Sequence, residues 1–106
     1  MDAKTLTALK GSIAKWEAIV AGTGEDRGAA NCPLCAVFHH SLRSSCEGCP
    51  VERSTGQYGC LGSPYEHFTD AFTTPINDLR EADRPEATCL AQDELDFLRS
   101  LLPTAP

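Results

Sequence analysis

The amino-acid sequence predicts a mainly α-helical single domain over residues 1–106, stabilised by a bound metal ion. Two segments, at about 3–21 and 84–102, repeat apolar residues at spacings of three and four, which is the period of an amphipathic helix. Five of the six cysteines lie between them, in residues 32–62. No segment alternates apolar and polar residues over more than a few positions, as a half-buried β-strand would. We therefore expect helices on both sides of a cysteine-rich, zinc-knuckle-like loop region.

The first predicted helix runs from about Ala3 to Ala21. Its apolar residues recur three or four positions apart and share one face: Leu6, Leu9, Ile13, Trp16 and Val20. The lysines of the segment, Lys15 among them, mostly lie off that face. Gly22 follows the last turn, where glycine commonly ends a helix. Residues 22–31 contain three glycines and show no periodicity, so we expect them to form a loop.

Residues 32–62 are expected to form knuckles and loops, with one short helix over Ala36–Leu42. The C-terminal part, residues 63–102, is expected to be helical. It opens with Ser63-Pro64-Tyr65-Glu66, which has the form of a capping box with proline at the first helical position. Pro75 should end this helix near Thr73, and a short turn or helical piece should follow over Ile76–Ala82.

The last predicted helix has Asp83 as its cap and runs from about Arg84 to Leu102. Its apolar stripe contains one acidic interruption, Glu94, among five leucines: Leu90, Leu95, Leu98, Leu101 and Leu102. Pro103 should stop the helix. We expect the first and last helices to pack against each other through four residues: Trp16, Ile13, Leu95 and Leu98.

Five cysteines are spaced as metal ligands. Their order is Cys32-Pro-Leu-Cys35, ten residues, Cys46-Glu-Gly-Cys49, ten residues, and Cys60. A C-x-x-C pair in a tight turn can bind one ion with both sulfurs, and two such pairs complete the four-sulfur shell of a structural zinc site. In a reducing cytosol, clustered cysteines are more often metal ligands than disulfides. The spacing therefore predicts one Zn²⁺ held by thiolates drawn from these five residues.

The pattern leaves alternative ligands open. Cys60 is either the fourth ligand, with one member of the first pair spare, or is spare itself. His39 or His40 could replace a thiolate, although a surface or packing role is the simpler interpretation of both. His67 is expected to be exposed or to serve in packing. Cys89 is expected in the core, because an unbound cysteine behaves as a small apolar residue.

Other chemistry also fits clustered thiolates. Cys49 is followed by Pro50, as in some motifs that bind iron–sulfur clusters, and such clusters also take four thiolates. An iron–sulfur or redox-sensing protein is therefore the first alternative to a zinc protein. Disulfides or unbound thiols are a further one.

The net charge of −6 belongs to the C-terminal part of the chain. Residues 1–62 carry six acidic and six basic residues, whereas residues 63–106 carry nine acidic and three basic residues. Sequence-independent binding of nucleic acid needs a basic surface to replace phosphate counterions. A nucleic-acid-binding zinc module, in which Arg43 and Arg53 would contact phosphates, is therefore the second alternative only. The acidic part could meet a basic protein surface, or simply keep the protein soluble.

No catalytic motif accompanies the cysteines. A zinc deaminase would need His-x-Glu ahead of Pro-Cys-x-x-Cys, and here Pro50 follows its cysteine pair. There is no glycine-rich phosphate loop and no nucleophile elbow, and a thiol oxidoreductase would place its C-x-x-C in a βαβ setting. The sequence favours a non-catalytic protein. Met1 leads into a polar stretch without a secretory signal, and no apolar run could span a membrane, which favours the cytoplasm.

A longer pattern of the form CxLC, CxGCP and CxG[ST]PY runs through residues 32–65. It is formed here by Cys32, Leu34, Cys35, Cys46, Gly48, Cys49, Pro50, Cys60, Gly62, Ser63, Pro64 and Tyr65. This pattern resembles that of small uncharacterised proteins of phage and prophage genomes. The resemblance implies the host cytosol as the compartment and a host protein as the partner. The expected function is a small zinc-binding, non-catalytic protein-interaction module that modulates or inhibits a host defence or regulatory protein.

Overall fold

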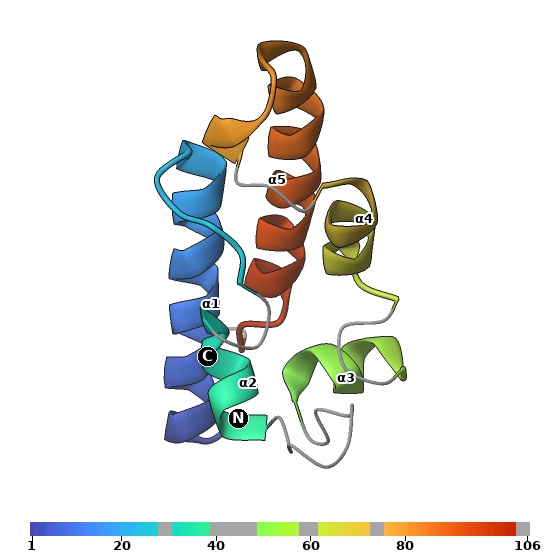
Figure 1. Cartoon of the computed structure of the whole chain (residues 1–106). Coiled ribbons are helices and arrows are strands. Elements are labelled where there is room, and N and C mark those ends of the chain that lie inside the picture. The colour runs from blue at the N-terminus through green and yellow to red at the C-terminus, as the bar shows by residue number, and fades with distance from the viewer. Residues whose placement is uncertain (28–30, 39–48, 58–61, 73–75, 104–106) are drawn as a thin grey trace.

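The computed structural model describes residues 1–27, 31–38, 49–57, 62–72 and 76–103. These residues form helices and no β-strand, which confirms the predicted mainly α fold. Figure 1 shows the elements in chain order: α1 (Ala3–Ala21), α2 (Pro33–Phe38), α3 (Pro50–Thr55), α4 (Pro64–Ala71), the 3₁₀ turns η2 (Ile76–Asp78) and η3 (Glu81–Asp83), and α5 (Arg84–Ser100). Among the described helices, none combines the length and the apolar composition that crossing a membrane requires.

Helix α1 spans the residues that its periodicity predicts. The Asp2 carboxylate accepts the Thr5 backbone N–H at 2.7 Å and so satisfies one of the unpaired donors of the first turn. At the other end Gly22 has φ +82°, and its N–H donates to the carbonyls of Ala18 and Ile19. This left-handed conformation is readily available to glycine alone. Both ends of α1 are therefore set by local capping.

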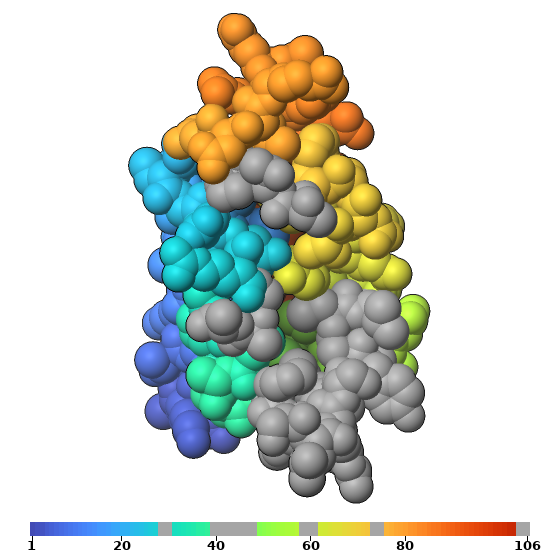
Figure 2. Space-filling view, in the orientation of Figure 1, coloured from blue at the N-terminus to red at the C-terminus, as the bar shows by residue number. Residues whose placement is uncertain are grey.

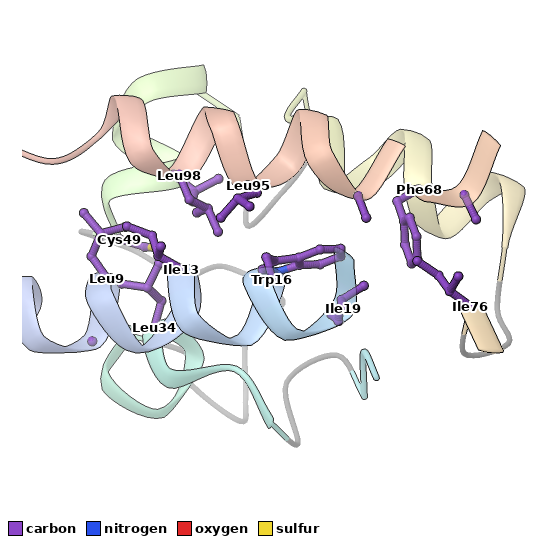
Figure 3. Close-up of a cluster of buried hydrophobic side chains, with 14 residues drawn as sticks. Leu9, Ile13, Trp16, Ile19, Leu34, Cys49, Phe68, Ile76, Leu95 and Leu98 are labelled. Carbon is purple, nitrogen blue, oxygen red and sulfur yellow. The ribbon is translucent and has the colours of Figure 1, made fainter. Parts of the chain in front are cut away.

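Helices α1 and α5 lie side by side and run in opposite directions (Figure 1). The predicted contact residues Trp16, Ile13, Leu95 and Leu98 are all buried in one core (Figure 3). The periodicity missed Ile19, which is 1% exposed, whereas Val20 is only half-buried. The buried face of α1 is thus turned slightly from the predicted one, because α2 and α4 share it with α5.

Helix α4 covers the side of the core that contains Trp16. The Trp16 ring meets the Tyr65 and Phe68 rings edge-on, with centroids 5.7 and 5.2 Å apart. Such T-shaped pairs add about 0.5–1.5 kcal/mol beyond the area that they bury. One tryptophan on α1 therefore anchors both α4 and α5.

The predicted capping box at the start of α4 does not form. Ser63 is buried, and its hydroxyl makes no cap hydrogen bond. The Glu66 carboxylate accepts the N–H of Gly62, at 2.9 Å, instead of the N–H of Ser63. The reason is the turn at Gly62, whose φ of +78° directs that N–H toward Glu66. The helix ends at Ala71; residues 73–75, where the proline stop was predicted, lie outside the described residues.

Helix α5 begins at Arg84 as predicted, but Asp83 does not cap it. Asp83 has helical φ and ψ, since it closes the turn η3, and its carboxylate accepts a hydrogen bond from Arg80 Nε at 3.3 Å. A side-chain cap needs an extended backbone at that position. The helix ends at Ser100, two residues before the predicted end, and a tight turn through Leu102 follows.

The cysteine-rich region contains more helix than predicted. Helix α2 starts three residues before the predicted Ala36, because Pro33 occupies its first position and the Ala36 N–H closes a turn onto the Cys32 carbonyl at 3.0 Å. Residues 39–42 of that prediction lie outside the described residues. Helix α3 falls where a loop was expected. Its signals are Pro50 at the first position and Gly56, with φ +72°, at the end.

Candidate metal centre

The pair Cys32 and Cys35 forms a knuckle at the start of α2. Cys32 directly precedes the helix, and Cys35 lies in its first turn. The Cys35 backbone N–H donates to the Cys32 sulfur, Sγ, at 3.1 Å. Both side chains are half-buried. A sulfur that accepts a backbone N–H is favoured as the thiolate, which is the form of cysteine that binds metal.

The charge of Cys32 is set by its neighbours. The pKa of its thiol falls to about 6, first because of a hydrogen bond with the Cys35 side chain. The Cys35 backbone N–H and the Lys15 ammonium lower this pKa further, whereas burial opposes the shift. Cys32 therefore carries a thiolate near neutral pH, and protons compete less for a metal ligand of this kind.

Lys15 reaches this region from α1. Its Nζ lies 2.8 Å from Oδ1 of Asp26, and each of the two side chains is only 11% exposed. The same ammonium lies 5.6 Å from the centroid of the Trp16 ring, within the range of a cation–π interaction. Lys15 is therefore largely covered, which the apolar pattern of α1 did not predict. Loop 22–27 covers it, and periodicity within one helix carries no information about a covering loop.

Glu94 is a buried acid in the same part of the molecule. It is 3% exposed, and its Oε1 has no hydrogen-bond partner among the residues that the structure describes. Burial raises its pKa to about 8, against the lowering effects of the Tyr65 backbone and Lys15. The charge of Cys32 also raises this pKa, so the two side chains are close enough to interact electrostatically. Its sequence signal is an acidic residue within the apolar stripe of α5.

Cys49 is placed differently from the first pair. It directly precedes α3, is 4% exposed and packs in the core beside Leu9 and Leu34 (Figure 3). Cys46 and Cys60 lie outside the described residues. Within the described ranges, no three His, Cys, Asp or Glu residues come together as a group that could hold a metal ion. Among the described residues, the structure therefore brings Cys32 and Cys35 together but does not place Cys49 beside them as a third ligand.

Of the other candidates, His39, His40 and Arg43 also lie outside the described residues. His67 and Arg53 are exposed. Cys89 is exposed too, so the prediction that it belongs to the core is wrong. The buried face of α5 includes Ala87 and Ala91. Cys89 lies two positions from each of them, and two residues turn a side chain by about 200° around the helix axis, so Cys89 faces away from the core.

The described site therefore brings two cysteines together at the start of α2, and its surroundings favour the thiolate of Cys32. Its electrostatics come from three residues that the cysteine spacing did not indicate: Lys15, Asp26 and Glu94. Comparison of the chain with protein-family models, curated proteins and solved structures finds no match.

Proposed function

We propose that this chain is a small zinc-binding, non-catalytic protein-interaction module. The ion is held by thiolates drawn from Cys32, Cys35, Cys46, Cys49 and Cys60. The observation that carries the proposal is the hydrogen bond from the Cys35 N–H to the Cys32 sulfur, at 3.1 Å. Bonds of this kind orient a ligating sulfur and stabilise its negative charge, which is the role of the groups around a metal ligand.

A structural role for the ion follows from the size of the chain and the number of thiolates. A chain of 106 residues buries a thin core, so a cross-link between α2 and α3 adds stability that side-chain packing alone does not supply. Four thiolates also fill the tetrahedral shell of zinc. A filled shell leaves no position for a substrate or an activated water, which is why the module is non-catalytic.

The partner is a protein with a basic surface. The exposed acids Glu86 and Asp93 lie one above the other on the outer side of α5, seven residues apart. Residues 76–86, orange in Figure 2, form one end of the molecule and include three more acids: Asp78, Glu81 and Asp83. Opposite charges steer association and suppress wrong partners. The resemblance of residues 32–65 to phage proteins points to a protein of a bacterial host.

The metal is tested by metal content and visible absorption of the full chain, purified without oxygen. We expect about one zinc per chain and no colour. Iron, sulfide and a brown colour would instead identify an iron–sulfur protein. Protein that is folded without any metal would contradict both assignments.

The partner is tested by capture from bacterial lysate with the tagged full chain at low and high salt. We expect one reproducible protein partner that is lost when Glu86 and Asp93 are both changed to lysine. The same charge reversal at Asp70, an exposed residue of α4, is the matched control. Equal capture by the wild type and the Glu86/Asp93 variant would contradict an interaction through α5.

A further inference from the structure

We propose that Cys32 and Cys35 form a dithiol that exchanges with small disulfides and closes into an intramolecular disulfide. The two sulfurs are also proposed metal ligands, so the consequence that exchange releases zinc rests on the proposed function. The exchange itself does not, because it requires only the two thiols and their surroundings.

The geometry places the two thiols in position to react with each other. The Cys35 backbone N–H donates to the Cys32 sulfur at 3.1 Å, and the Ala36 N–H closes a turn onto the Cys32 carbonyl. Neither residue forms a disulfide in the structure. A disulfide requires the sulfurs to approach to about 2.05 Å. Side-chain rotation can supply this approach, since both residues belong to the same turn at the start of α2.

The surroundings distinguish Cys32 as the attacking sulfur. It accepts the Cys35 backbone N–H at 3.1 Å, and a hydrogen-bond donor stabilises negative charge on sulfur. It is half-buried, so a small disulfide can reach it. Cys49, by contrast, is 4% exposed within the core. Cys89 is exposed on α5, so it serves as an internal reference for an accessible thiol.

The chemistry balances with the disulfide as the oxidant. The Cys32 thiolate attacks one sulfur of the disulfide RSSR, its S–S bond breaks, and the first thiolate leaves, giving a mixed disulfide on Cys32. The Cys35 thiol then gives up its proton to solvent and attacks the Cys32 sulfur. The second thiolate leaves as the Cys32–Cys35 bond forms. In total the protein loses two hydrogens and RSSR becomes two RSH.

The experiment uses the reduced full chain, its zinc content measured beforehand, and oxidised glutathione as the disulfide at neutral pH. Quenched samples are examined by intact mass and peptide mapping, and released zinc is measured with a colorimetric chelator. We expect a Cys32–Cys35 disulfide to form about tenfold faster than glutathione attaches to Cys89. In the Cys35→Ser variant the reaction should stop with glutathione on Cys32. Cys89→Ser is the matched control and should leave the first reaction unchanged.

The outcomes separate this inference from the metal assignment. A Cys32–Cys35 disulfide that forms together with zinc release supports both. The same disulfide in protein that holds no metal supports the exchange and contradicts the zinc module. Glutathione that stays on Cys32 in the wild type, or reaction at Cys89 alone, overturns the exchange whatever the zinc content. The wild-type peptide map decides this even if Cys35→Ser fails to fold.

Discussion

Lys15 Nζ lies 2.8 Å from Asp26 Oδ1 in an ion pair that is almost fully covered. The pair ties α1 to the loop that leads to Cys32, and its ammonium also favours the Cys32 thiolate. The neighbouring pair of Arg27 and Glu25 is far more exposed, with side-chain exposures of 66% and 39%. Two ion pairs of the same loop thus differ mainly in burial, which makes them a matched comparison.

Replacing Lys15 by methionine should destabilise the fold by about 3 kcal/mol, because it removes the cation that neutralises the covered Asp26 carboxylate. Arg27→Met should cost less than about 1 kcal/mol, because exposed pairs contribute little. Urea unfolding of the two variants measures both values. Equal effects would show that the covered pair contributes no more than the exposed one.

Glu94→Gln should change how stability depends on pH. The pKa of Glu94 is about 8 in the folded chain against 4.5 for an ordinary glutamate, so the folded state holds a proton that the unfolded state has lost. Stability from this group is therefore complete below pH 4.5 and is lost as pH rises to 8. The variant should gain on the order of 5 kcal/mol relative to the wild type across that window.

The measurement for Glu94 is the difference in unfolding free energy between variant and wild type at each pH. The difference is needed because a second group also makes stability depend on pH. The pKa of Cys32 is lowered from 9.0 to about 6, so Cys32 adds stability as pH rises between those values, whereas Glu94 removes it. Asp93→Asn, at the exposed neighbouring position, is the control for removing a carboxylate from α5. An unfolding free-energy difference for Glu94→Gln that does not change with pH would mean that Glu94 is ionised in the fold.

Leu9→Ala should cost about 2–5 kcal/mol, the range for a leucine removed from a packed core. Leu9 is 0% exposed, whereas Leu6, one turn earlier on α1, is half-buried. Leu6→Ala should therefore cost only about 1 kcal/mol. Chemical denaturation gives the unfolding free energy of both variants. A larger loss of stability for Leu6→Ala than for Leu9→Ala would contradict the placement of Leu9 at the centre of the core.

Gly22→Ala should destabilise the chain more than Gly56→Ala. Both glycines end helices in the left-handed region, with φ of +82° and +72°, so alanine at either should cost about 1 kcal/mol. At Gly22 the added Cβ would also lie 2.8 Å from Oδ1 of Asn77, whereas nothing lies within 4 Å at Gly56. Thermal unfolding should show a lower melting temperature for Gly22→Ala than for Gly56→Ala. Adding Asn77→Ala to the Gly22→Ala variant should reduce this gap in melting temperature.

Cysteine variants should separate metal ligands from other cysteines. Cys32→Ser and Cys49→Ser should lose the zinc and unfold the cysteine-rich region, because binding energy at such a site is also folding energy. Cys89→Ser should keep the wild-type zinc content, because Cys89 lies exposed on α5. Metal analysis and circular dichroism give the two readouts. Equal loss of zinc in all three variants would contradict the proposed ligands.

Periodicity was sufficient to predict the long helices. The range of α1 agrees with its pattern, and the start of α5 is correct, because many residues repeat one face over four or more turns. Helix α3 was not predicted because six residues are too few to show a period, although Pro50 and Gly56 mark its ends. The expected caps at Ser63 and Asp83 failed because backbone conformation at Gly62 and in η3 decides which groups meet.

The sequence by itself determined the helical class, the pairing of α1 with α5 through Trp16 and Leu98, and the closeness of Cys32 and Cys35. Each of these depends on local spacing or on a long repeated face. Only the tertiary structure decided that Lys15 meets Asp26, that Glu94 is buried near Cys32, and that Cys89 faces outward. These features depend on which elements cover a side chain, and that coverage follows from the packing of distant segments rather than from local sequence.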